Sequence, residues 1–134
     1  MIVYAATPGP RREPSLAAFE AIAEGRAVGL TSAAVLEEVW HLELSDQVEG
    51  LAGQAERAHA ILRPVLAIDD EVLAIAFDLS PRGGARLGAN DRLHAATCIR
   101  HGIETILSAD RGFDSVRELT RVDPLDAHAL DDLW

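Results

Sequence analysis

The sequence contains no lysine, a single cysteine and no long run of apolar residues. Cys98 cannot form a disulfide within the chain, and its apolar neighbours predict a buried thiol. No stretch approaches the roughly 18 to 20 uncharged apolar residues of a membrane-spanning helix, and the amino terminus lacks a basic region followed by an apolar stretch. Because of these absences, we expect a soluble, cytoplasmic protein.

Charge of one sign is also scarce, because twelve arginines face 22 acidic residues and the net charge is -10. A molecule of this charge repels a phosphate backbone, which argues against broad, nonspecific nucleic-acid binding. A nuclease that contacts its substrate through a few arginines and bound metal ions remains compatible, as does a basic protein partner. The acidic tail at 125–134 ends in Leu133 and Trp134, and it is either solvated or a docking segment for a partner.

The 134 residues, 49% of them hydrophobic, fit one domain over 1–134 that buries roughly two-thirds of its unfolded surface. Helical and strand patterns alternate along the chain without internal repeats, which predicts an α/β domain with a largely parallel sheet. Helical spacing of apolar residues predicts helices over 15–25, 32–42, 47–62, 70–79 and 91–101, and apolar runs predict strands over 27–31, 65–68, 102–109 and 119–123.

Capping and turn residues mark the ends of these elements. Ser15, Ser32 (or Thr31) and Asp69 (or Asp70) are expected as helix caps, while Pro64 and Gly102 end helices. The glycine-rich segment 80–89 is expected to be a mobile loop, and 110–119 a loop with one short helix.

The segment 90–114 carries the most information about function. Asp91 opens a helix, and Asp110 stands just past the carboxyl end of the strand that follows. In an open parallel sheet that end is where ligands bind. Clustered carboxylates suit Mg²⁺ or Mn²⁺, because these cations are hard and prefer oxygen ligands. The pattern therefore predicts a metal site.

The same segment, NDRLHAATCIRHGIETILSADRGFD, closely resembles the PIN-domain family of metal-dependent ribonucleases, in particular the VapC-like toxins of bacteria and archaea. The shared pattern runs D-x-L-H-A-A, then G-I, then L-x-T/S-x-D-x-x-F. The resemblance implies a three-layer α/β/α fold with a central, mainly parallel sheet. It also implies RNA as substrate, a cognate antitoxin as partner, and a homodimer.

Three acids match the family's pattern. Glu38 lies in TSAAVLEEVWHL, which resembles the S-x-x-V-L-x-E helix, while Asp91 and Asp110 match the two later aspartates. The resemblance makes these three the metal ligands and catalytic residues. Each also has an ordinary explanation, as a solvated helix acid, a first-turn acid and a turn residue respectively.

Three neighbouring residues are further candidates for the same metal site. Glu37 is turned by about 100 degrees from Glu38 on the helix, so only one of the pair can face a site. Asp114 is a further metal ligand or caps the following turn. His94 is expected to be structural, with a hydrogen bond to the site left open.

Other polar residues receive weaker assignments. Thr31 or Ser32, together with Ser108, could orient water or carboxylates where strands meet loops. Arg92 and Arg111 are either phosphate contacts or members of surface ion pairs. No chemistry is assigned to the remaining histidines, which are His41, His59, His101 and His128.

Relative to the family, the sequence lacks a first metal-binding aspartate. Members begin with a buried strand ending in D-T/S-N, commonly followed by x-L/I-V-Y-A-A-x-P, whereas this chain begins MIVYAATPGP. In one register the aspartate and the whole first strand fall ahead of Met1, which should leave two unpaired sheet edges. In the other, residues 1–4 form the strand and Ala5 replaces the aspartate. We favour the first register and expect a start several codons upstream.

The leading interpretation is a Mg²⁺- or Mn²⁺-dependent endoribonuclease of a toxin–antitoxin pair, in which metal-bound water attacks the RNA phosphodiester. The second is a catalytically impaired PIN-like domain that binds an antitoxin, RNA or itself. A third and weaker interpretation is a hydrolase of small phosphoesters, since fold alone does not fix the substrate.

Overall fold

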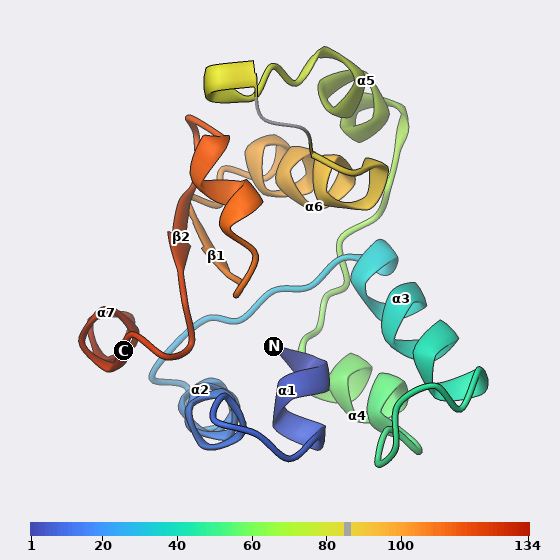
Figure 1. Ribbon diagram of the computed structural model, residues 1–134, viewed down its shortest axis with the longest axis vertical. Helices are drawn as coiled ribbons and strands as arrows, with labels where there is room; N and C mark the ends of the chain where they lie inside the picture. Colours follow the sequence, from blue (N-terminus) through green and yellow to red (C-terminus); the bar gives the residue numbers. More distant parts are fainter. Residues whose placement is uncertain (85–86) are drawn as a thin grey trace.

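The computed structural model describes residues 1–84 and 87–134. Residues 85–86, on which the expected mobile loop partly falls, lie outside the described residues. The elements in chain order are α1 (Ile2–Ala6), α2 (Arg12–Ala23), α3 (Ala33–Leu44), α4 (Gln54–Ile61), α5 (Asp70–Asp78), η1 (Arg82–Gly84), α6 (Ala89–Arg100), β1 (Thr105–Leu107), η2 (Arg111–Ser115), β2 (Thr120–Val122) and α7 (Ala127–Asp131). The fold is therefore mixed α/β and mostly helical (Figure 1).

The sheet is small. β1 and β2 pair in parallel, with Thr105 opposite Thr120 and Leu107 opposite Val122. One isolated parallel bridge joins Ser32 to Leu66. The expected strand over 27–31 is wrong for this structure, because the segment is extended but has no ladder partner in the described part of the chain. A central sheet between two helical layers was also expected. Among the described residues, the sheet consists of the β1–β2 pair and the single bridge between Ser32 and Leu66.

Capping residues and a glycine predicted the ends of several helices correctly. Asp69 caps α5 by accepting the backbone N–H of Val72, and Ser32 caps α3 by accepting that of Val35. Gly102 follows α6 with a φ of +64°, a conformation that favours glycine and ends the helix as predicted. The strands expected over 102–109 and 119–123 are confirmed in their central residues as β1 and β2.

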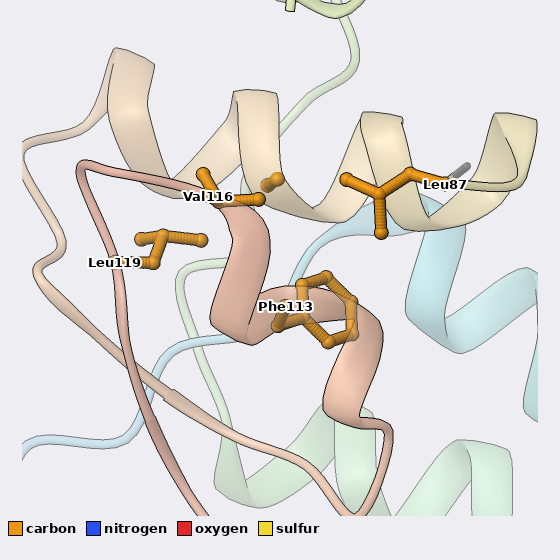
Figure 2. Close-up of a cluster of buried hydrophobic side chains, with 5 residues drawn as sticks. Leu87, Phe113, Val116 and Leu119 are labelled. Carbon is orange, nitrogen blue, oxygen red and sulfur yellow. The ribbon is translucent and has the colours of Figure 1, made fainter. Parts of the chain in front are cut away.

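The carboxy-terminal part is built around α6. Leu87, Ala95, Phe113, Val116 and Leu119 form one buried cluster beneath this helix, and Figure 2 shows the ring of Phe113 between Leu87 and η2. On another face of α6, Ala96 packs against the buried Val72 and Ala76 of α5. Small residues on α6 allow these close approaches, so α6 is the central helix of this region.

The amino-terminal part has its own cluster, which joins Ile2 of α1, Val39 of α3, Ala58 of α4 and Leu62. Since Ile2–Ala6 is helical, the register in which residues 1–4 form a strand is wrong. Ser15 is not a cap but lies buried inside α2, which begins at Arg12.

The third predicted helix is shorter than its periodicity indicated. The helix expected over 47–62 is observed only as Gln54–Ile61, because Gly50 and Gly53 adopt left-handed conformations with φ of +85° and +72° that interrupt it. The apolar residues Val48 and Leu51 keep the spacing of a helix, although the backbone over 47–53 is not helical. The segment 65–68 contributes only the bridge at Leu66.

The tail at 125–134 is partly folded. Its helix α7 is capped by Asp126, buries Leu130 and contacts α2. Cys98 is half-buried on α6, and burial raises the pKa of its thiol to about 11, in line with an unreactive cysteine. Within the described residues, no helix is long and apolar enough to cross a membrane.

Candidate functional site

A pocket of about 490 Å³ lies among the amino-terminal segment, α3, α6 and the end of β1. Three carboxylates line it, those of Glu38, Asp91 and Asp110, and His94 and Ser108 lie beside them. No arginine is among the described residues of its lining. The three predicted ligands thus line one pocket from separate elements, and among its described residues His94 is the side chain that can carry a positive charge.

Glu38 is held from the opposite helix. One of its carboxylate oxygens accepts the Asn90 amide at 2.6 Å, and the other lies 3.1 Å from His94 Nε2. A proton on Nε2 makes this second contact a hydrogen bond and leaves Nδ1 as an acceptor. His94 Nδ1 is buried and has no partner in the described part of the molecule. These contacts connect α3 to α6 and fix the direction of the Glu38 side chain.

Asp91 lies in the first turn of α6. Its Oδ2 accepts the backbone N–H of Gly88 at 3.2 Å, so the side chain caps its own helix. The helix dipole also favours a negative charge at this position. Asp91 therefore combines the ordinary role of a first-turn acid with a place on the pocket wall.

Asp110 stands just beyond β1, as predicted. Its Oδ1 accepts the N–H of Gly112 at 2.7 Å and caps η2, while its own N–H donates to Ser108 Oγ at 3.0 Å. A Cβ atom at Gly112 would lie 3.1 Å from that carboxylate oxygen. The tight turn thus holds one oxygen of Asp110 and leaves Oδ2 without a partner among the described residues.

Two other acids do not line this pocket. Asp114 forms a two-pronged ion pair with Arg121, at 2.8 and 3.4 Å, and this pairing raises the pKa of the arginine. Glu37 is exposed, so of the adjacent pair only Glu38 faces the pocket. Metal binding by Asp114 stays a prediction.

Two arginines adjacent to the acids differ in their surroundings. The Arg92 guanidinium donates to the backbone carbonyls of Ala76, Leu79 and Leu87, which ties the end of α5 to the start of α6. Arg111 is exposed and forms no ion pair with the described residues. Of these two arginines, Arg92 is accordingly tied to the backbone, whereas Arg111 is free to contact an external anion.

The three carboxylates fit a divalent cation in their chemistry, since they are hard oxygen donors in a pocket with no arginine among its described lining. Their positions fit less closely. No group of three or more histidine, cysteine, aspartate or glutamate side chains converges in the described ranges 1–84 and 87–134. Asp91 and Asp110 are instead turned toward backbone N–H groups of their own turns, and Glu38 toward Asn90 and His94 on α6.

The sequence did not single out two features of the site. Asn90 was not identified as a partner of Glu38, because the two are 52 residues apart and only the fold brings them together. The amino terminus was not expected at the pocket, although Met1 and Ile2 line it.

Comparison with known protein families matches residues 1–119 to the PIN domain. Neither the curated proteins nor the solved structures gave a match. The matched range includes α1 through η2, and therefore every lining residue of the pocket named above.

Proposed function

The chain belongs to the PIN-domain family of nucleases, and from this membership we propose that it is a metal-dependent endoribonuclease, the toxin of a toxin–antitoxin pair. The observation that supports the proposal is that Glu38, Asp91 and Asp110 line one pocket that has no arginine in its described lining. Ionised carboxylates that line one pocket repel one another, and a bound cation relieves that repulsion.

PIN domains typically use divalent metals, and Glu38, Asp91 and Asp110 would hold Mg²⁺ or Mn²⁺ in this chain. When bound, such an ion makes a water nucleophilic near neutral pH and offsets the charge that develops on the phosphoryl oxygens. Asn90 and His94 orient Glu38 for this role. Ser108 positions the backbone of Asp110. Asp114 is the fourth candidate ligand, available only if its ion pair with Arg121 opens.

The partners proposed are an RNA substrate, a cognate antitoxin and a second copy of the chain. The net charge of -10 supports a basic protein partner. The exposed Trp40 and Leu44 of α3 support a protein interface, because large apolar side chains seldom remain in water together.

A second candidate function has an observation of its own in favour. Because no three acids converge in the described residues, the chain as written could be a catalytically impaired PIN domain that binds an antitoxin or RNA. A domain of this kind keeps the PIN fold and a surface that binds a partner, but it does not hydrolyse RNA.

RNA cleavage in Mn²⁺ separates the two candidates. We expect the purified chain to cut RNA and Asp91→Asn to abolish cleavage. Asp69→Asn is the matched control, because Asp69 also caps a helix but lies outside the pocket lining. Cleavage that survives Asp91→Asn contradicts the proposed site.

A form extended by the in-frame codons ahead of Met1 completes that experiment. Cleavage by the extended form alone places the missing ligand upstream. If neither form cuts RNA but both bind a partner, the impaired binding domain is the correct candidate.

A further inference from the structure

One arginine bonds the turn that carries Asp110 at both of its ends. The Nη1 group of Arg121 donates to the backbone carbonyl of Ser108 at 2.9 Å, on the near side of Asp110 in the chain. Its Nε and Nη2 groups donate to the two carboxylate oxygens of Asp114, on the far side, at 2.8 and 3.4 Å. Because a guanidinium group is rigid and planar, these bonds set the two ends of the turn relative to each other.

Arg121 is itself held in the sheet. It is the middle residue of β2 and lies opposite Ile106 of β1 in the parallel ladder. Its side chain is only 12% exposed, and Asp123 Oδ2 lies 3.5 Å from Nη1. Since β1 leads into the turn, the arginine connects the turn to the sheet from the neighbouring strand.

The carbonyl of Ser108 depends on a side-chain donor because of a proline. Just past the paired residues of β1, the N–H of Ser108 donates to the carbonyl of Val122 at 3.1 Å. The bonds of a parallel ladder alternate between the strands, so the next one would run from the N–H of residue 124 to the carbonyl of Ser108. Residue 124 is a buried proline and has no N–H. Arg121 supplies the donor at this point instead.

The two contacts of the arginine should differ in strength. The Asp114 side chain is 52% exposed, and ion pairs in water contribute little to stability. The bond to the Ser108 carbonyl is partly buried, and a carbonyl left without a donor away from water is costly. The contact with Ser108 is therefore expected to hold the turn more strongly than the pairing with Asp114.

Bonds inside the turn carry this position to the Asp110 carboxylate. The Ser108 hydroxyl accepts the N–H of Asp110 at 3.0 Å, and Asp110 Oδ1 accepts the N–H of Gly112 at 2.7 Å. Ser108 is thus bonded to Arg121 through its carbonyl and to Asp110 through its hydroxyl. One residue joins the arginine to the acid.

We propose that Arg121 is a positioning residue for Asp110, and that it takes the place of the backbone donor that Pro124 cannot supply. It fixes the backbone of Ser108, and through it the direction of the carboxylate that lines the pocket. The effect on a bound cation rests on the proposed function. The arrangement itself can be measured without metal or RNA.

Amide hydrogen exchange of the metal-free chain tests this arrangement. Arg121→Met removes every donor of the side chain and keeps its aliphatic part, whose packing alanine would lose. We expect the amides of Asp110 and Gly112 to exchange roughly tenfold faster in this variant, because their hydrogen bonds open more often once the turn is released. Arg100→Met is the matched control, since Arg100 also forms an ion pair, with Glu71, but lies outside the described lining of the pocket.

A second substitution tests the role of Pro124. Pro124→Ala supplies a backbone N–H where the ladder would next donate to Ser108. In the Arg121→Met background it should restore part of the lost protection, whereas a general effect on folding would add a further loss, because a buried ring is removed. Slower exchange at Asp110 and Gly112 in the double variant than in Arg121→Met supports the proposal, and equal or faster exchange overturns it.

Calorimetric titration of Mn²⁺ tests the consequence for the site. Removal of a positive charge near carboxylates should by itself strengthen cation binding. Release of the Asp110 turn should weaken it, and we expect Arg121→Met to bind Mn²⁺ roughly tenfold more weakly than Arg100→Met. Because the two effects differ in sign, a loss of charge cannot account for the expected result.

Two further results would overturn the proposal. Unchanged exchange at Asp110 and Gly112 in Arg121→Met would show that the turn keeps its position without the arginine. Equal or tighter Mn²⁺ binding by Arg121→Met than by Arg100→Met would show that the arginine acts through its charge or by holding Asp114 away from the site. If the unmodified chain binds no Mn²⁺, the proposed function fails, and the exchange measurements still decide the role of Arg121.

Discussion

The part of the molecule from α5 to β2 and the part from α1 to α4 are stabilised differently. In the first, β1 and β2 pair through three residues each and cover a cluster that contains Phe113, which is 3% exposed. In the second, helices pack well, but residues 28–30 have no backbone hydrogen-bond partner in the described chain, and Val28 lies in water. Strand pairing therefore holds β1 against β2, whereas the described chain shows none along residues 28–30.

The candidate site depends on both parts. Glu38 comes from the amino-terminal part, whereas Asp91 and Asp110 come from the carboxy-terminal part. Asn90 and His94 connect the two through Glu38. The geometry of the carboxylates is thus sensitive to how well the two parts are held together.

The largest expected effect lies in the carboxy-terminal cluster. Phe113→Ala removes a buried ring between α6 and η2, and should lower the free energy of unfolding by about 3–5 kcal/mol. Urea denaturation measures this change. A loss below about 1 kcal/mol would show that this part is less well packed than the cluster implies.

The connection between the two parts should contribute less. Removal of the Asn90 amide by Asn90→Ala breaks a hydrogen bond to a half-exposed carboxylate, and we expect a loss of about 1 kcal/mol. A double-mutant cycle with Glu38→Gln isolates this interaction. Additive losses would mean that the two side chains do not interact in solution.

Acid should weaken a second connection. Asp123 accepts the N–H of Leu125, and lies 3.4 Å from Arg11 and 3.5 Å from Arg121; the backbone hydrogen bond and then these arginines lower its pKa. A lowered carboxyl pKa gives stability that is present above the unfolded value near 4 and is lost as the pH falls through the folded value. Asp123→Asn should therefore flatten the decline in thermal stability below pH 4, and an unchanged decline would contradict this assignment.

The smallest effect is expected at Val28, which lies in the unpaired segment 28–30. Val28→Thr should change the free energy of unfolding of the chain as written by less than about 0.5 kcal/mol, because the side chain is in water. Denaturation with Leu62→Ala as the buried comparison checks this, since Leu62 is 5% exposed. A loss comparable to that of the buried variant would show that Val28 is covered in solution.

Local signals in the sequence predicted local structure. The cap at Asp69, the end of α6 at Gly102 and the position of Asp110 after β1 depend on a few adjacent residues, and all are observed. The resemblance predicted that Glu38, Asp91 and Asp110 form one metal site. The three line the same pocket, but they do not converge as a group among the described residues, so their role stays a prediction.

Non-local contacts could not be predicted in the same way. The state of residues 27–31 depends on a pairing partner distant in the chain, so an apolar strand pattern was no guarantee of a strand. The link from Asn90 to Glu38 requires α3 and α6 to pack side by side. The turns of Asp91 and Asp110 toward backbone N–H groups are rotamer choices that composition does not determine.

Calorimetric titration of Mn²⁺ tests the central claim that these carboxylates form a cation site. The double variant Asp91→Asn/Asp110→Asn is compared with Asp69→Asn/Asp126→Asn, which removes the same charge from two capping aspartates outside the pocket lining. We predict that the unmodified chain and the control bind Mn²⁺ with similar affinity and that the pocket variant binds at least about tenfold more weakly. Equal affinity of the two double variants would contradict the account.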